Sequence, residues 1–249
     1  MPDQRGRTAL VTGANSGIGY QVATELARRG AAVLLACRDT GRGTRARDKI
    51  VRWVPGAEVE FVALDLADLD SVERLASQVA SRDGGLDLLV NNAGVMAVPR
   101  RQVTAQGFEL QFGVNHLGHF ALTGRLLPVL LGRPGSRVVT VSSILHRFGS
   151  IRLDDLSSED GYGRWRAYSQ SKLANALFTL ELDRRLRAAG AEVISVGAHP
   201  GYTSTGLMHS GPRLGGGGVF AHVMGAAAPF TGQPAALGAL PVLRAATDP

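Results

Sequence analysis

The sequence predicts a single α/β domain built on a doubly wound parallel sheet with helices on both faces. Two observations lead to this class. Short apolar runs alternate with longer segments of helical periodicity, and the first run leads into a glycine-rich turn. Six strands are expected, in the sheet order 3-2-1-4-5-6. In chain order they cover residues 8–12, 32–37, 59–64, 86–90, 137–141 and 192–198.

Composition limits the class of protein. The chain has 249 residues and 45% hydrophobic content, which suits one domain over residues 1–249. The formal charge is +6, but the arginines are scattered, so no nucleic-acid partner is expected. The single cysteine, Cys37, excludes an internal disulfide and fits a reducing compartment. There is no export signal and no apolar run of about 20 residues, so we expect a cytoplasmic protein without a membrane span.

The first strand, turn and helix predict a phosphate site. The strand at residues 8–12 runs into the turn, and the following helix ends at Gly30. Backbone N–H groups at the start of such a helix bind a pyrophosphate, and glycine lets the ligand approach closely. The glycine spacing is G-x3-G-x-G. The residues expected to bind the dinucleotide are Gly13, Asn15, Ser16, Gly17, Ile18 and Gly19.

The end of the second strand predicts the cofactor. An acidic residue there would accept hydrogen bonds from the adenosine ribose and repel a 2′-phosphate. This chain has Cys37 at that position and Arg38 next to it. A guanidinium can bind a 2′-phosphate through two hydrogen bonds, so we expect NADP(H) rather than NAD(H). Asp39 opposes this prediction, and Arg38 as a simple surface charge is the alternative.

The next segments place further residues at strand ends. A basic helix is expected over residues 44–54, and Ser71 is a candidate cap for the third helix. Asp65 and Leu66 follow the third strand, where adenine is read in open α/β sheets. The fourth strand leads into Asn91-Asn92-Ala93-Gly94, whose small and amide residues suit backbone contact with a ribose. The alternative is an ordinary turn.

Residues 107–131 form a long apolar segment with an asparagine inside it. Asn115 competes for backbone groups, so it can loosen a helix and hold a water, although most interior asparagines are structural. His116 and His119 lie close by, without acidic or cysteine partners at ligand spacing. We therefore expect them to pack or to line a pocket, and no metal site is predicted.

The last strands bring a hydroxyl, a phenol and an ammonium to the same edge. Ser142 and Ser143 end the fifth strand, and a serine there can donate to a carbonyl oxygen. Tyr168 and Lys172 are one helical turn apart, so they share a face. A cation beside a phenol lowers the phenol pKa, which makes an acid/base group. Alone, the pair is more often a surface contact, but lysine is rare in this arginine-rich chain.

The connection over residues 144–166 is long and either shapes the mouth of a pocket or covers a strand edge. After the sixth strand comes a turn with Pro200 and Gly201. Residues 203–233 are rich in glycine and apolar side chains, and we expect a mobile substrate lid, with a disordered loop as the alternative. A last helix begins near Pro234.

Together these residues resemble the short-chain dehydrogenase/reductase family over nearly the whole chain. The resemblance rests on residues 12–19, residues 91–94, Asn115, Ser143, Tyr168 to Lys172 and Pro200-Gly201, all in family order. Residues 36–39, 114–120 and 171–175 are similar to the retinol-dehydrogenase and WW-domain-oxidoreductase-like branch. The fold implied is a Rossmann-type sheet. The reaction implied is hydride transfer between NADP(H) and a carbonyl or alcohol, and the apolar lid indicates a hydrophobic one.

The family resemblance also implies the role of each residue in a catalytic tetrad. Tyr168 is the general acid or base, Lys172 lowers its pKa and binds the nicotinamide ribose, and Ser143 polarises the substrate carbonyl. Ser142 is the competing serine. Asn115 holds a water that links Lys172 to solvent. The remaining cofactor contacts implied by the resemblance are Asp65, Leu66, Asn91, Ala93, Gly94, Pro200, Gly201, Thr203 and Thr205.

Two expectations concern the rest of the molecule. The branch usually carries a further strand and tail after the final helix, whereas this chain ends at Pro249. Either the sequence is truncated or the natural protein is short, and the seventh strand of the branch would then be missing. A homodimer or homotetramer through the helices that contain Asn115 and Tyr168 is expected from the family alone. A non-catalytic NADP(H)-binding or redox-sensing protein is the alternative function, which an intact tetrad disfavours.

Overall fold

A six-stranded parallel sheet forms the centre of the computed structural model, which describes residues 1–201 and 233–248. The strand order is β3-β2-β1-β4-β5-β6, as predicted. The strands are β1 (Thr8–Thr12), β2 (Ala32–Cys37), β3 (Val59–Ala63), β4 (Leu88–Asn91), β5 (Arg137–Val141) and β6 (Ile194–Ala198).

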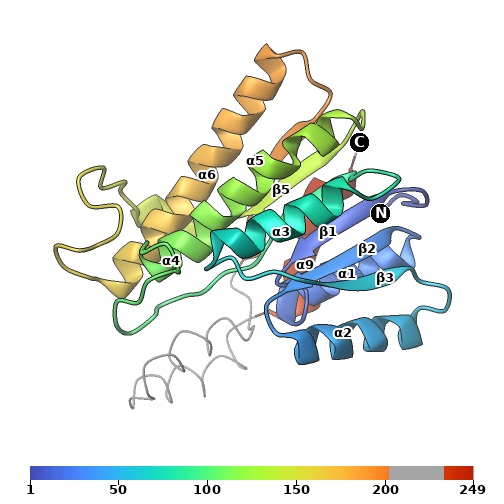
Figure 1. Cartoon of the computed structure of the whole chain (residues 1–249), viewed down its shortest axis with the longest axis horizontal. Coiled ribbons are helices and arrows are strands. Elements are labelled where there is room, and N and C mark those ends of the chain that lie inside the picture. The colour runs from blue at the N-terminus through green and yellow to red at the C-terminus, as the bar shows by residue number, and fades with distance from the viewer. Residues whose placement is uncertain (202–232, 249) are drawn as a thin grey trace.

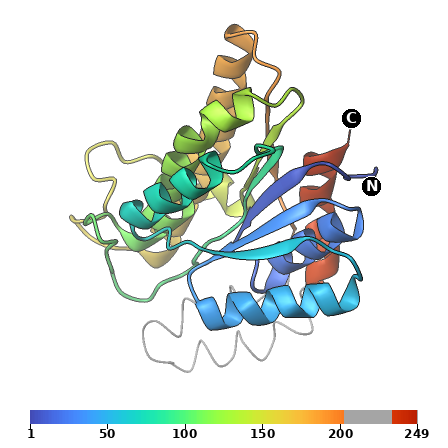
Figure 2. The ribbon, with the colours of Figure 1, turned by 45° about the vertical axis from the view of Figure 1, so that its right-hand side comes forward.

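Two layers of helices cover the sheet (Figures 1 and 2). One face carries α1 (Gly17–Arg28), α2 (Thr40–Trp53) and α9 (Ala235–Thr247). The other face carries α3 (Leu69–Ala80), α5 (Gly118–Leu131) and α6 (Arg164–Ala188). The fully buried side chains that join each layer to the sheet include Leu26, Ile50 and Val242 on the first face and Leu75, Leu122, Leu126 and Leu130 on the second.

The register of the strands aligns their carboxyl ends at one edge. Thr12 pairs with Ala36 across β1 and β2, and Val141 pairs with Ala198 across β5 and β6. The strand order changes direction between β1 and β4, since β2 and β4 flank β1 on opposite sides. A crevice for a ligand forms at such a switch point. The loops that follow the strands therefore define where the site lies.

Two predicted helix starts are wrong. Helix α2 begins at Thr40, not at residue 44, because the Asp39 carboxylate accepts a hydrogen bond from the N–H of Arg42 and caps it. Helix α3 begins at Leu69 and is capped by Asp68, not by Ser71. The Ser71 hydroxyl instead accepts a hydrogen bond from the N–H of Asp65, which ties the end of β3 to α3.

The segment around Asn115 is an interrupted helix. A short α4 (Leu110–Phe112) leads into a π-helical turn, η1 (Gly113–Leu117), before α5 begins. The N–H of Gly118 donates to the carbonyl of Gly113, one residue further back than in an α-helix. The expected loosening of the helix at Asn115 is thus present as a π turn.

Other expectations lie partly outside the described residues. The predicted lid falls almost entirely between residues 201 and 233, and only Gln233 of it is described. The connection after β5 contains a short 3-10 helix, η2 (Ile144–Phe148). In the part of the chain that the structure describes, no helix combines the length and apolar character needed to cross a bilayer.

Candidate active site

The four residues of the predicted tetrad come together at the carboxyl edge of the sheet. Tyr168 and Lys172 lie on α6, Ser143 directly follows β5, and Asn115 sits in the π turn. The Lys172 ammonium lies 5.8 Å from the centre of the Tyr168 ring. A methyl group built on Gly94 would lie 3.1 Å from Oδ1 of Asn115 and 3.8 Å from Nζ of Lys172. The turn after β4 therefore runs directly past both side chains.

Lys172 is a buried ammonium. It is 3% exposed, and its Nζ donates a 3.0 Å hydrogen bond to the carbonyl of Val141 at the end of β5. Burial lowers its pKa to about 8. An ammonium has three donors. One of these N–H donors bonds to the Val141 carbonyl, and the other two suit the hydroxyls of a ribose.

Burial and Ser143 set the pKa of Tyr168. Burial raises it to about 12, and the Ser143 side chain acts in the opposite direction. The Lys172 ammonium faces the ring and bonds to Val141, and the lowering of this pKa by Lys172 stays a prediction. Tyr168 is therefore a protonated phenol at neutral pH.

The geometry separates the two candidate serines. The Ser142 hydroxyl donates a 2.8 Å hydrogen bond to the backbone carbonyl of Lys172 and so fixes α6 against β5. The Ser143 hydroxyl interacts with Tyr168 and accepts from the N–H of Leu145. Of the two serines, Ser143 is therefore the one whose hydroxyl interacts with the phenol.

Asn115 joins three segments through its side-chain amide. Its Oδ1 accepts from the N–H of Val95 at 2.8 Å, and its Nδ2 donates to the Val95 carbonyl at 3.0 Å. The same Nδ2 donates to the Ser171 hydroxyl at 2.9 Å. Both amide protons are thus used within the protein. Asn115 links the turn after β4 to the helix that carries Tyr168 and Lys172, while a water held there stays a prediction.

The glycine-rich turn fits a pyrophosphate. Gly13 and Gly17 have φ angles of 66° and 58°, which favour glycine. A methyl group on Gly19 would collide with Nδ2 of Asn92 and would lie 2.6 Å from the carbonyl of Gly13. Ser16 makes no side-chain cap to α1, and the first turn of α1 has no acidic residue. The N–H groups at this helix start therefore suit an anion.

The residues at the end of β2 are a buried thiol, an exposed guanidinium and a carboxylate that caps α2. Cys37 is buried, and desolvation with the Asp39 charge raises the pKa of its thiol to about 11. The Arg38 side chain is 73% exposed and lies 4.0 Å from a carboxylate oxygen of Asp65. Since Asp39 caps α2, its carboxylate is already engaged in that helix start.

A cationic hollow of about 400 Å³ adjoins the glycine-rich turn. The turn contributes Asn15, Ser16 and Gly17, and α2 contributes the cations. These cations are Arg42, Arg45 and Lys49, and the Lys49 ammonium also lies 5.4 Å from the centre of the Tyr20 ring. The sequence prediction named Arg38, which does not line this hollow, and none of the three cations that do. The three-to-four-residue spacing of the cations along α2 is the signal that was not used.

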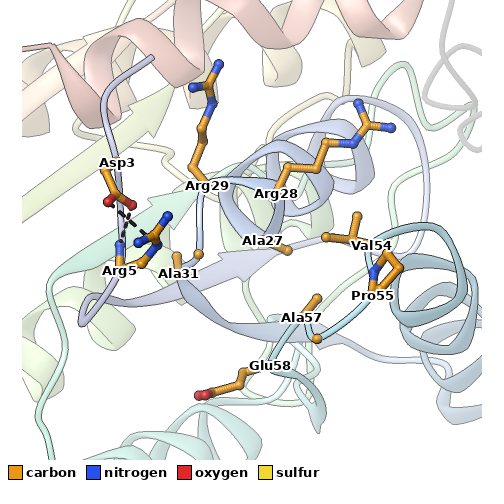
Figure 3. A pocket seen from close by; sticks show the side chains of 12 residues that line it. Asp3, Arg5, Ala27, Arg28, Arg29, Ala31, Val54, Pro55, Ala57 and Glu58 are labelled. Carbon is orange, nitrogen blue, oxygen red and sulfur yellow. Dashed lines mark hydrogen bonds and ion pairs between the residues drawn. The ribbon is translucent and has the colours of Figure 1, made fainter.

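A second hollow lies at the opposite edge of the sheet (Figure 3). It measures about 410 Å³ and is lined by the ends of α1 and α2, including Arg28, Arg29 and Pro55. Asp3 and Arg5 pair with each other at its rim (Figure 3). None of the tetrad residues lines it, so we place no part of the site there.

The other predicted cofactor residues are placed unequally. Asn91 is buried, and its Nδ2 donates to the Thr123 hydroxyl on α5, so its side chain faces away from a ligand. Leu66 packs against the start of α5, where a methyl group on Gly118 would meet its carbonyl. Gly201 has a φ angle of 70°, and Gln233 donates to the carbonyl of Pro200. Thr203 and Thr205 lie outside the described residues.

The parallel sheet, the glycine-rich turn and the four tetrad residues are together typical of dehydrogenases that use a nicotinamide cofactor. Comparison with known proteins identifies the family. The chain belongs to the short-chain dehydrogenase family, whose model matches residues 7–213. Retinol dehydrogenase 14 of Homo sapiens is 45% identical over 215 residues, or 81% of this chain and 63% of the relative. Retinol dehydrogenase 13 of Homo sapiens is 46% identical over 208 residues, or 83% of this chain and 62% of the relative.

A solved structure is similarly close. An uncharacterized protein from Mycobacterium Paratuberculosis is 46% identical, with a TM-score of 0.80 over 100% of this chain and 79% of that one. The chain spans less than two thirds of the length of the two retinol dehydrogenases. The retinol-dehydrogenase-like branch that the sequence motifs indicated is thus confirmed.

Proposed function

We propose that the chain is an NADP(H)-dependent oxidoreductase that transfers a hydride between the nicotinamide and a hydrophobic carbonyl or alcohol. The observation that carries the proposal is the buried Tyr168–Lys172 pair beside Ser143 at the carboxyl edge of the sheet. A nicotinamide, when bound, would supply or accept the hydride. The chain itself supplies the binding, the orientation and the proton.

In the reductive direction, we infer a role for each residue of the tetrad that contacts the reacting groups. Ser143 donates to the substrate carbonyl oxygen and holds it beside the phenol. Tyr168 gives its proton to that oxygen as the carbon is reduced. With its pKa raised by burial, Tyr168 keeps this proton at neutral pH until it is donated. Lys172 holds the ribose and stabilises the phenolate that is left.

NADP(H) is favoured over NAD(H) by the charges around the glycine-rich turn. Arg38 follows β2, and three further cations of α2 line the adjoining hollow. A 2′-phosphate placed there would be attracted by guanidinium and ammonium groups. The Asp39 carboxylate, which would repel it, caps α2 and lies 3.5 Å from the guanidinium of Arg42.

The substrate class is supported by the relatives. The two human relatives are named retinol dehydrogenases, and retinol is a long apolar alcohol. Among the described residues, exposed apolar side chains stand in the connection between β5 and α6, including Ile144 and Phe148. We therefore propose an apolar aldehyde or alcohol as the substrate of this chain.

The proposal is tested by following NADPH consumption with retinal and a series of shorter aldehydes and ketones. We expect turnover, and Y168F should lower kcat by roughly 10²- to 10⁴-fold, since the proton donor is lost. Y162F is the matched control, because the Tyr162 hydroxyl donates to the Val98 carbonyl away from the tetrad. Equal activity of Y168F and the wild type would disprove the mechanism. Tight NADPH binding without turnover would favour the non-catalytic alternative.

A further inference from the structure

His119 connects the end of β1 to the π turn. The side chain is 1% exposed. Its Nδ1 lies 3.0 Å from the backbone carbonyl oxygen of Asn115, and its Nε2 lies 2.9 Å from the hydroxyl of Thr12. That hydroxyl also accepts from the N–H groups of Asn92 and Ala93, each at 2.9 Å. One imidazole therefore joins the π turn to the turn after β4.

These contacts define the tautomer of the ring. A carbonyl oxygen only accepts, so the proton must be on Nδ1. Nε2 is then an acceptor and takes the proton of the Thr12 hydroxyl, whose two lone pairs serve Asn92 and Ala93. The carbonyl of Val90 is a second acceptor for that proton, but at the longer distance of 3.3 Å.

A protonated ring does not fit this arrangement. An Nε2–H group would have to share the Thr12 oxygen with two backbone N–H groups. Burial lowers the pKa of His119 to about 3, and the nearby charges of Lys172 and His116 act in the same direction. A histidine that only filled space would need neither of the two polar contacts.

We propose that His119, as the neutral Nδ1–H tautomer, is a positioning residue that fixes the turn after β4 and Asn115 relative to the glycine-rich turn. The proposal rests on the function proposed above, since these turns would hold the nicotinamide ribose and the tetrad. The contact with Thr12 positions the turns that would bind the cofactor. The contact with Asn115 positions the π turn next to Lys172.

The tautomer is tested directly in the protein without cofactor. Histidine-labelled protein is observed by long-range ¹H–¹⁵N NMR, and the signal that disappears in the His119→Asn variant identifies His119 among the six histidines. We expect the Nδ1–H tautomer with no protonation between pH 5 and 8. An Nε2–H tautomer, or protonation within this range, would overturn the proposal whatever the NADPH affinities of the variants are.

Two substitutions separate the two contacts. In His119→Asn the amide nitrogen replaces Nδ1 and keeps the bond to Asn115, whereas in His119→Gln the amide oxygen replaces Nε2 and keeps the bond to Thr12. We expect His119→Gln to bind NADPH roughly tenfold more tightly than His119→Asn, and His119→Asn to keep the higher kcat. Equal losses in both variants, or no loss in either, would refute a positioning role.

A control variant accompanies the two His119 variants, and a failure of the proposed function can be told apart from a failure of this inference. Thr179→Val removes another buried hydroxyl, which donates to the Asn175 carbonyl on the same helix, and should leave the NADPH dissociation constant and kcat unchanged. If the wild type binds NADPH without reducing any carbonyl, the proposed catalysis fails. The tautomer and the difference in NADPH affinity between the two His119 variants then still decide the inference.

Discussion

Nζ of Lys172 donates a 3.0 Å hydrogen bond to the carbonyl oxygen of Val141, the last residue of β5. The same carbonyl lies 3.4 Å from Nδ2 of Asn175, one turn further along α6. These contacts hold α6 against the strand end, and so they place Tyr168 beside Ser143. The cost is a buried ammonium, because desolvation disfavours the charged form.

The buried ammonium predicts a specific pH dependence of stability. The pKa of Lys172 falls from 10.5 to about 8 on folding. Between these values the unfolded chain binds more protons than the folded one, so the free energy of unfolding rises with pH. K172M has no ammonium at this position. The free energy of unfolding of K172M minus that of the wild type should therefore fall by about 3 kcal/mol from pH 8 to 10.5.

The measurement is urea unfolding of both proteins across this pH range. The matched control is K49M, because Lys49 is the chain's other lysine and is exposed. A constant difference between K172M and the wild type from pH 7 to 10.5 would show that the Lys172 ammonium is not destabilised by burial.

The cofactor preference is tested at Arg38. R38D replaces an exposed guanidinium with a carboxylate that accepts from ribose hydroxyls and repels a phosphate. We expect the ratio of kcat/KM for NADPH to that for NADH to fall roughly 10- to 100-fold, as for the loss of a charge-assisted hydrogen bond. R28D is the control, because it makes the same change of charge on α1, where Arg28 pairs with Glu25.

A second outcome at this site is equally informative. If R38D keeps the preference and the double variant R42A/R45A loses it, the 2′-phosphate binds in the cationic hollow beside the glycine-rich turn. If both R38D and R42A/R45A keep the preference for NADPH, neither Arg38 nor these two arginines of α2 bind a 2′-phosphate, and the physical basis of the NADP(H) assignment is wrong.

Much of the fold could be predicted from local patterns. Buried parallel strands are short continuous apolar runs, so their positions and order followed from the sequence. The carboxyl ends of parallel strands meet at one edge, which is why Ser143 and the glycine-rich turn could be assigned to one site. Asn115 signalled a weak point in its helix because its amide competes for backbone groups.

The remaining features depend on three-dimensional contacts. Asp39 and Asp68 cap helices that Thr44 and Ser71 were expected to begin, a choice among nearby candidates that only packing decides. The Thr12–His119 hydrogen bond joins residues 107 positions apart, which no short motif reveals. The raised pKa of Tyr168 follows from its depth in the fold, and the sequence shows only that a lysine is near.

The close approach at Gly19 predicts a steric effect of substitution. A methyl group there would collide with Nδ2 of Asn92 and would lie 2.6 Å from the backbone carbonyl of Gly13. Since backbone atoms cannot move aside cheaply, G19A should lower the free energy of unfolding by about 1–3 kcal/mol and weaken NADPH binding.

The control for G19A is G124A on α5. A methyl group on Gly124 would meet nothing within 4 Å. Alanine is the better helix former, so G124A should raise the free energy of unfolding by roughly 0.5–1 kcal/mol. Urea unfolding and NADPH titration of both variants check the pair, and a G19A protein that unfolds and binds like the wild type would contradict the expected steric clash.

The expected homo-oligomer is tested on the outer surface of α5 and α6. Phe120 on α5 is 55% exposed and Leu177 on α6 is 48% exposed. The Phe120 ring lies 5.5 Å from that of Phe178, so the apolar surface continues from one helix to the other. A second copy that covers this surface would bury these side chains, and a charge placed there would oppose association.

We expect L177D to shift the protein from a dimer or tetramer to a monomer in light scattering coupled to size-exclusion chromatography. L153D is the control, because Leu153 is equally apolar and 83% exposed but lies in the connection before α6. If both variants keep the wild-type mass, the association does not use the α5–α6 surface. If the wild type itself is a monomer, the expectation drawn from the family fails for this chain, because an exposed apolar surface alone does not make a stable interface.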